Sequence, residues 1–277
     1  MKKIAVINDL SGFGRCSLTA AIPIISVSGS ECSPLPTAIL SNQTGYESFY
    51  CDDYTDKIDF FTSEWKKLNK SFDGILTGFL GSIDGVDKVL NFIKTFKTEK
   101  TILVVDPVMA DDGEIYSTYN KKFCSEIKKL VSVSNVITPN LTELCILTEK
   151  DFSELLSHSN DDDYFEIIVS LAKEVLNDCL KTVIVTGIEK GDSIFNMAVS
   201  ENDSFTVHSK KMGNGYSGTG DIFSAIIVSQ LVNGKTIKSA VKTATSFLEK
   251  AIEDSFNEGT DANDGVNFEK YLGELIP

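Results

Sequence analysis

The chain has 277 residues, of which 42% are hydrophobic, and it carries a formal net charge of -14. This length and composition suit one large α/β domain or two smaller ones with a buried core. The negative charge disfavours nucleic acid and anionic membrane surfaces as partners, because both attract basic faces. An anionic ligand would therefore be held locally, by helix ends, a bound cation or a few placed side chains.

The first apolar stretch of the chain, Ile4–Ile7, is too short for a signal peptide, and no segment approaches the roughly 20 apolar residues of a membrane span. We therefore expect a cytoplasmic protein without membrane contact. The six cysteines form no CxxC pair, which favours buried reduced thiols over a zinc site or a disulfide framework.

Short β-branched runs alternate with helical patterns through the first two thirds of the chain, which is typical of a parallel sheet flanked by helices. The predicted strands are Lys3–Asn8, Ser30–Pro34, Gly74–Thr77, Thr101–Val105, Asn135–Thr138 and Thr182–Val185. Because the carboxyl ends of parallel strands meet at one edge of a sheet, the segments after these strands should together form the ligand site.

The later part of the chain changes pattern. An antiparallel hairpin of Ser193–Val199 and Ser204–His208 should extend the sheet, and helices should complete the chain. The acidic stretches Asn160–Asp163 and Glu253–Gly265 are predicted to be solvated loops. The simplest organisation is one layered α/β domain over residues 1–277.

Two early segments bear on the kind of ligand. Gly12–Ser17 follows a strand, but Ser17 replaces the third glycine of a dinucleotide fingerprint, so we do not predict such a site. Asn42–Tyr46 offers amide and hydroxyl groups beside an aromatic ring, which would suit a small polar ring as substrate. Phe79 could supply a second stacking face, although core packing explains it equally well.

Acidic residues follow two of the predicted strands. Asp106–Gly113 contains three carboxylates, among them Asp106 and Asp111, and hard oxygen ligands suit Mg²⁺; a solvated acidic loop is the simpler alternative. Glu143 falls in the first turn of the next predicted helix and is a second candidate metal or water ligand. Its three-residue spacing from Asn140 also matches an ordinary capping box.

The turn Gly218–Asp221 precedes an apolar run, Ile222–Val228, with the periodicity of a buried helix. Glycines allow close backbone approach, and the first N–H groups of a helix attract a phosphate without any lysine. Asp221 would then lie within reach of the group that attacks that phosphate. The alternative is a tight turn in which Asp221 only caps the helix.

Five segments in this order resemble the pyridoxal/pyridoxamine kinase branch of the ribokinase-like superfamily. They are Ser41–Tyr46, Leu76–Ser82, Asp106–Met109, Ile137–Glu143 and Gly218–Asp221. The resemblance runs from Ile4 to about Lys250. It implies a three-layer αβα sandwich with a mostly parallel central sheet, ATP and Mg²⁺ as co-substrate and cofactor, and a homodimer, and it leaves open whether a monovalent cation takes part.

The resemblance also implies roles for individual residues. Asp221 would be the base that takes the proton from the 5′-hydroxymethyl group of a B6 vitamer, and the N–H groups of Gly218, Thr219 and Gly220 would stabilise the transferring phosphoryl group. The remaining roles are phosphate and magnesium organisation by Asp106, Asp111 and Glu143, nucleotide contact by Asn140, Thr186, Thr219 and Gly220, and pyridine contact by Thr44.

Two positions depart from the family pattern. Asp9 stands where a serine contacts the pyridine ring, and Phe79 stands where a tyrosine is common, so the choice among pyridoxal, pyridoxine and pyridoxamine stays open. A hydroxymethylpyrimidine or hydroxymethylpyrimidine-phosphate kinase is the nearest alternative. Such enzymes usually have a segment that resembles Gly-Thr-Gly-Cys, with a cysteine where this chain has Asp221. A vitamer-binding protein without catalysis is a further alternative.

Overall fold

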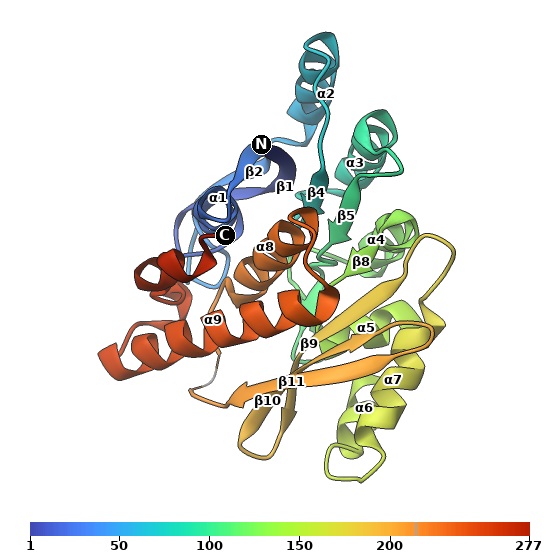
Figure 1. Cartoon of the computed structure of the whole chain (residues 1–277), viewed down its shortest axis with the longest axis vertical. Helices are drawn as coiled ribbons and strands as arrows, with labels where there is room; N and C mark the ends of the chain where they lie inside the picture. The colour runs from blue at the N-terminus through green and yellow to red at the C-terminus, as the bar shows by residue number, and fades with distance from the viewer. Residues whose placement is uncertain (214) are drawn as a thin grey trace.

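A nine-stranded sheet runs through the middle of the computed structural model, which describes residues 1–213 and 215–277 (Figure 1). The strand order is β11-β10-β9-β8-β5-β4-β1-β2-β3. Six neighbouring strands are parallel to one another. They are β9 (Thr182–Lys190), β8 (Val136–Ile137), β5 (Ile102–Val105), β4 (Gly74–Thr77), β1 (Lys2–Phe13) and β2 (Ser30–Asn42).

Antiparallel strands complete both edges of this sheet. The predicted hairpin is confirmed as β10 (Ser193–Val199) and β11 (Ser204–Lys210), with β10 paired to β9. At the other edge, β3 (Cys51–Asp53) pairs with β2. A separate small hairpin is formed by β6 (Ala110–Asp111) and β7 (Glu114–Ile115).

Helices cover both faces of the sheet, as Figure 1 shows. One layer contains α2 (Ile58–Lys67), α3 (Ile83–Phe96), α4 (Lys121–Val133), α5 (Leu141–Thr148), α6 (Phe152–Ser157) and α7 (Tyr164–Glu174). The other contains α1 (Ser17–Val27), α8 (Thr219–Val232), α9 (Ile237–Glu258) and the 3₁₀ segment η3 (Phe268–Leu275). Two short 3₁₀ turns, η1 (Thr55–Lys57) and η2 (Ala262–Asp264), lie in connecting segments.

The two cores follow from the alternation of side chains along each parallel strand. In β1, Ile4 and Val6 pack with α1, α8 and α9, while Ala5 and Ile7 pack with the opposite helix layer. Because successive strand residues point to opposite faces, a strand that is apolar throughout must be covered on both sides. The prediction of a three-layer αβα sandwich with a mostly parallel sheet is confirmed.

Helix α8 is the helix that carries the glycine turn to the sheet edge. It is buried along most of its length because it lies between α1 and α9 and packs on β4 and β5. The predicted apolar run, Ile222–Val228, is fully buried. A helix that is apolar all round can only be stable inside the protein, so its amino terminus is fixed in place by packing.

Three predicted strands are longer in the structure. β1 and β2 remain paired as far as Phe13 and Asn42, with a bulge between Asn8 and Leu10, so Gly12 and Phe13 belong to a strand rather than to a loop. β9 continues to Lys190 because β10 pairs with it from the other side. Strand extension by a neighbouring strand is a long-range effect, which a local sequence pattern does not report.

The predicted loop Glu253–Gly265 is only partly correct. Helix α9 continues to Glu258, and the hydroxyl of Ser255 is buried, where it accepts a hydrogen bond from Asn267 N at 2.7 Å. Contact with η3 therefore stabilises an acidic stretch that would otherwise be expected to fray. The stretch at 160–163 does form turns, as predicted.

Two predictions from composition can be compared with the structure. All six cysteines are free thiols, as the lack of paired spacing indicated, but only Cys16, Cys124 and Cys145 are buried. The expectation of burial is wrong for Cys51 and Cys179, which are exposed, Cys51 because it lies on the short edge strand β3. Across residues 1–213 and 215–277, no helix combines the length and the apolar character that a bilayer crossing would require.

Candidate active site

Helix α8 begins where the carboxyl ends of the central strands meet. Asp106 directly follows β5, and its Oδ2 accepts a hydrogen bond of 2.9 Å from the Ser224 hydroxyl of α8. The Ser224 and Thr138 hydroxyls lie 2.8 Å apart, and Thr138 follows β8. These buried contacts tie the first turns of α8 to two strand ends, so that a ligand at this edge meets a fixed surface.

The glycine turn adopts the conformation that its sequence predicts. Gly218 is the N-cap of α8 and has φ = 79°, and a Cβ built on it would lie 2.1 Å from the backbone oxygen of Arg15. At Gly220, a Cβ would lie 3.8 Å from Asp106 Oδ2. Only glycine fits at Gly218, and the small Gly220 leaves the helix terminus open beside a carboxylate.

The amino terminus of α8 retains its anion-binding capacity. In the described part of the chain no side chain caps α8, while the Thr219 hydroxyl donates to Tyr216 O at 3.2 Å. The first N–H groups of a helix lack partners within the helix and carry a partial positive charge. This terminus is thus suited to bind a phosphoryl group.

Asp221 is half-buried in the first turn of α8. Its Oδ1 accepts a hydrogen bond of 2.8 Å from Asn8 Nδ2, and its carboxylate also accepts from Ser17 N at the start of α1. Burial raises the pKa of Asp221 to about 6, nearby Asp9 adds to the rise, and the two hydrogen bonds oppose it. The carboxylate is thus oriented by two elements and has a pKa suited to accepting a proton near neutral pH.

Asn8 is a site residue that the sequence analysis did not identify. It is 2% exposed, and its Oδ1 accepts from Phe79 N at 2.8 Å while its Nδ2 donates to Asp221. A Cβ on Gly78 would lie 2.5 Å from Asn8 Nδ2, so the glycine makes room for this amide. The only available signal was its place at the predicted carboxyl end of the first strand.

Asp106 and Glu143 form a buried acidic pair next to Asp221. Burial is the largest cause that raises the pKa of each, followed by Asp221 for Asp106 and by Asp106 for Glu143. Glu143 Oε1 accepts from Met109 N at 3.0 Å, and Oε2 accepts from Asn140 N at 2.9 Å. The alternative interpretation of Asn140 and Glu143 as a capping box is therefore confirmed for α5.

The three predicted metal ligands do not form one coordination set. In residues 1–213 and 215–277, no group of three or more His, Cys, Asp or Glu side chains is arranged to hold a metal ion. Both oxygens of Glu143 accept backbone N–H groups, and Asp111 lies exposed on the β6–β7 hairpin, where it accepts from Asp112 N at 3.0 Å. Within the described residues, the fold therefore does not bring these three acids together as ligands of one Mg²⁺ ion.

The predicted nucleotide residues Asn140 and Thr186 do lie together. They form a parallel bridge between the end of β8 and β9, and Thr186 N donates to Pro139 O at 2.9 Å. Asn140 Nδ2 donates to Ala110 O at 2.8 Å and to Asp111 Oδ1 at 3.3 Å, which connects this bridge to the β6–β7 hairpin. Both side chains are half-buried.

The predicted substrate residues have different environments. Thr44 is exposed in the loop after β2. Phe79 is half-buried, and its ring stacks on Tyr119 with 5.6 Å between centroids. Asp9 is 4% exposed, and its carboxylate accepts hydrogen bonds from the hydroxyls of Ser11 and Ser17. Asp9 therefore also orients Ser17, the residue whose N–H contacts Asp221.

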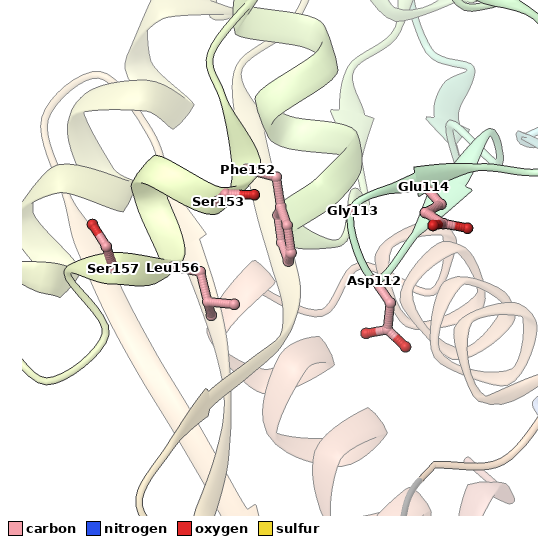
Figure 2. A pocket seen from close by; sticks show the side chains of 7 residues that line it. All are labelled: Asp112, Gly113, Glu114, Phe152, Ser153, Leu156 and Ser157. Atoms are coloured by element: carbon pink, nitrogen blue, oxygen red, sulfur yellow. The ribbon is translucent and has the colours of Figure 1, made fainter.

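A separate cavity of about 570 Å³ opens between the β6–β7 hairpin and α6 (Figure 2). Its lining includes the carboxylates of Asp112 and Glu114 and the ring of Phe152. A Cβ on Gly113 would lie 2.8 Å from Phe152, so the hairpin packs closely against α6. The lining contains neither Asp221 nor the glycine turn, and its two acids disfavour phosphate, so we do not place the reaction there.

Comparison with known proteins agrees with this geometry. A family model described as phosphomethylpyrimidine kinase matches residues 59–266, and the chain therefore belongs to that family. A pyridoxine/pyridoxal/pyridoxamine kinase of Bordetella avium is 23% identical over 253 residues, with 87% of this chain and 81% of the relative covered. A hydroxymethylpyrimidine/phosphomethylpyrimidine kinase of Haemophilus influenzae is 30% identical over 190 residues, with 66% and 65% covered.

A solved structure is similar over almost the whole chain. It is a candidate phosphomethylpyrimidine kinase of Bacteroides thetaiotaomicron, crystallised in a form with pyridoxal, and it is 35% identical with a TM-score of 0.92. The match covers 99% of this chain and 95% of the other. The predicted resemblance to pyridoxal/pyridoxamine kinases of the ribokinase-like superfamily is confirmed.

Replacing Gly218 by alanine should disrupt the glycine turn, because the new methyl group would overlap the backbone of Arg15. We expect a loss of kinase activity of at least about tenfold together with a lower free energy of unfolding, measured by turnover and urea denaturation. Gly234→Ala is the matched control, since Gly234 has φ = 78° and nothing within 4 Å of its Cβ position. Equal effects of the two substitutions would contradict this assignment.

Replacing Asp106 by asparagine should stabilise the protein at high pH. Burial raises the folded-state pKa of Asp106, so the ionised carboxylate costs stability, and that cost grows as pH rises through the folded-state pKa and vanishes in acid. We expect a Tm above that of the wild type at pH 8 and a gain that shrinks toward pH 5, measured by thermal melts without nucleotide. A gain independent of pH, or no gain at pH 8, would argue against a buried uncompensated charge.

Proposed function

We propose that this chain is an ATP-dependent kinase that phosphorylates the 5′-hydroxymethyl group of a B6 vitamer and gives the 5′-phosphate. The observation that carries this proposal is the carboxylate of Asp221, which Asn8 and Ser17 orient in the first turn of an uncapped, buried helix. A proton acceptor beside an anion-binding helix terminus is the arrangement that transfer of a phosphoryl group to an alcohol requires.

Asp221 accepts the proton of the vitamer hydroxyl as that oxygen forms a bond to the γ-phosphorus of ATP. The bond between the γ-phosphorus and the β–γ bridging oxygen breaks, and ADP leaves. The backbone N–H groups of Gly218, Thr219 and Gly220 stabilise the charge on the transferring group. Phosphoryl transfer passes through a loose transition state, so orientation and charge stabilisation matter more than the strength of the base. The rigid packing of α8 supplies that orientation before the substrates bind.

We place ATP along the edge from the glycine turn to the Asn140–Thr186 bridge, because the first N–H groups of α8 offer donors to phosphate oxygens and the bridge brings two half-buried polar residues to the carboxyl ends of neighbouring strands. Mg²⁺ fits beside Asp106, since Asp106, Glu143 and Asp221 concentrate negative charge that the described side chains leave largely uncompensated. Asp106 would hold Mg²⁺ there, with Asp111 acting through water, and the ion would supply positive charge that neutralises the phosphates.

The vitamer side of the site is the loop after β2 and the segment after β4. We assign Thr44 to contact with the pyridine ring and Phe79 to a stacking face, while the carboxylate of Asp9 is buried and held by two serine hydroxyls.

A hydroxymethylpyrimidine or hydroxymethylpyrimidine-phosphate kinase is the second candidate, and the matching family model carries that description. Such enzymes usually have a cysteine at the position that matches Asp221. The aspartate in this chain therefore favours a B6 vitamer as the acceptor. The solved structure that is 35% identical to this chain is a crystal form with pyridoxal, which supports the same choice. A binding protein without catalysis would bind both ligands and form no product.

Three further properties stay predictions. The chain is proposed to act in the cytoplasm, to form one kinase domain over residues 1–277 and to assemble as a homodimer, the last by resemblance alone. Size-exclusion chromatography with light scattering measures the assembly directly.

The acceptor is identified by incubating the purified protein with magnesium and ATP and each of pyridoxal, pyridoxine, pyridoxamine and hydroxymethylpyrimidine, with product detected by mass. We expect a phosphorylated product with at least one vitamer at a higher kcat/KM than with hydroxymethylpyrimidine. The reverse order would favour the second candidate, and binding without product would favour the binding protein.

Asp221→Asn should lower kcat by roughly 10²- to 10⁴-fold, because the amide cannot accept the hydroxyl proton. Affinity for ATP should be retained, because Asn keeps the shape of the side chain and removes a negative charge near the phosphates. Steady-state kinetics and calorimetric titration of a non-hydrolysable ATP analogue measure the two effects. Turnover close to that of the wild type would exclude Asp221 as the base.

Activity should fall in acid, since Asp221 must be ionised to accept a proton and burial raises its pKa to about 6. A plot of kcat/KM for the vitamer against pH, at saturating ATP, should lose activity as pH falls below about 6. Circular dichroism across the same range controls for unfolding. A plateau that continued to pH 5 would be inconsistent with Asp221 as an essential base of this pKa.

A further inference from the structure

The turn at Asp261–Gly265, far along the sequence from the vitamer loop, joins the segments on the acceptor side of the site. Ser217 N, next to the glycine turn, donates to Ala262 O at 2.9 Å, and Arg15 N, after β1, donates to Asp264 O at 3.1 Å. Gln43 Nε2, after β2, donates to Asn263 Oδ1 at 2.9 Å. One short turn therefore contacts three segments: the residue before the glycine turn, the segment after β1 and the loop after β2.

The fit between this turn and its neighbours is close. A Cβ on Gly45 would lie 2.6 Å from Asn263 Oδ1, and a Cβ on Gly265 would lie 2.9 Å from Arg15 Cβ and 3.1 Å from Ser217 O. Gly265 also has φ = 77°, which disfavours other residues. The turn is seated against these segments and has little freedom to shift without moving them.

The loop that carries Thr44 is anchored to the turn on both sides of that residue. Before it, Gln43 is 8% exposed and uses both ends of its amide, donating to Asn263 and accepting from Gly45 N at 2.6 Å. After it, the Tyr46 hydroxyl donates to Asp264 Oδ1. Thr44, exposed between these two anchors, takes its position from them.

The nucleotide side of the site lacks such a connection to the turn. Among the described residues, the hydrogen bonds that leave the turn reach Arg15, Gln43, Tyr46 and Ser217, and none reaches the Asn140–Thr186 bridge. A change in the turn should therefore affect acceptor binding and leave ATP binding in place.

We propose that the Asp261–Gly265 turn positions the acceptor-binding loop against the glycine turn, and that Tyr46 and Asp264 are positioning residues for the acceptor. This inference rests on the proposed function, because it assigns the acceptor to the loop of Thr44. Both residues act through the loop, so their loss should weaken acceptor binding without removing the base or the anion site.

The test compares Tyr46→Phe, Asp264→Ala and the double variant with the wild type; alanine is used at position 264 because asparagine would keep an oxygen that can accept from the Tyr46 hydroxyl. Each single variant should raise the KM for the preferred vitamer by about three- to tenfold, the usual effect of one lost hydrogen bond, while the KM for ATP stays within about twofold. The double variant should be no worse than the more affected single variant, because both changes remove the same interaction.

Tyr50→Phe is the matched control, because Tyr50 is 69% exposed and follows the same loop, and it should behave as the wild type. Thermal melts of all variants separate loop positioning from a general loss of stability. An unchanged vitamer KM in both single variants, an equal rise in the KM for ATP, or additive effects in the double variant would each overturn the inference.

Equilibrium binding of pyridoxal and of hydroxymethylpyrimidine, followed by protein fluorescence, separates this inference from the proposed function. If the wild type binds an acceptor but forms no product, the proposed function fails, and weaker binding to Tyr46→Phe and Asp264→Ala than to Tyr50→Phe still supports the inference. Binding equal to that of the wild type in all variants overturns it, as does a wild type that binds neither compound.

Discussion

The structure depends on how a single carboxylate is held at the start of a buried helix. Asp221 loses much of its solvent because α8 is packed between α1, α9 and the sheet, and two hydrogen bonds, from Asn8 and Ser17, fix the direction of its oxygens. Burial of a charge is costly unless it has partners, and here the partners are one amide and one backbone N–H. In the proposed mechanism this is the position of the proton acceptor.

The surroundings of Asp221 extend this arrangement in two directions. Toward the nucleotide, Asp106 and Glu143 add buried negative charge that suits a cation and phosphates better than it suits the empty protein. Toward the acceptor, Asn8 links Asp221 to the backbone of Phe79, and the turn at Asp261–Gly265 holds the loop of Thr44. In the proposed mechanism the two substrates meet at Asp221, which lies beside the acidic pair and is hydrogen-bonded to Asn8.

Local pattern was sufficient to predict the layers of the fold and the place of Asp221. Uniformly apolar strands such as Ile4–Ile7 require helices on both faces, and the glycines at 218 and 220 mark the start of the buried helix that carries Asp221. The lengths of β1 and β9, the role of Asn8 and the continuation of α9 to Glu258 depend on partners distant in sequence. Glu143 could not be assigned from the sequence either, because its three-residue spacing from Asn140 suited both a capping box and a metal ligand. The structure establishes the capping box.

The most direct test of the central claim is a crystal structure of the protein with magnesium, ADP, a planar phosphoryl mimic such as aluminium fluoride, and a vitamer. The account predicts that the mimic contacts the backbone N–H groups of Gly218, Thr219 and Gly220 and that the vitamer hydroxymethyl oxygen lies within hydrogen-bond distance of the Asp221 carboxylate. A mimic bound away from the amino terminus of α8, or a hydroxymethyl group that does not face Asp221, would contradict it.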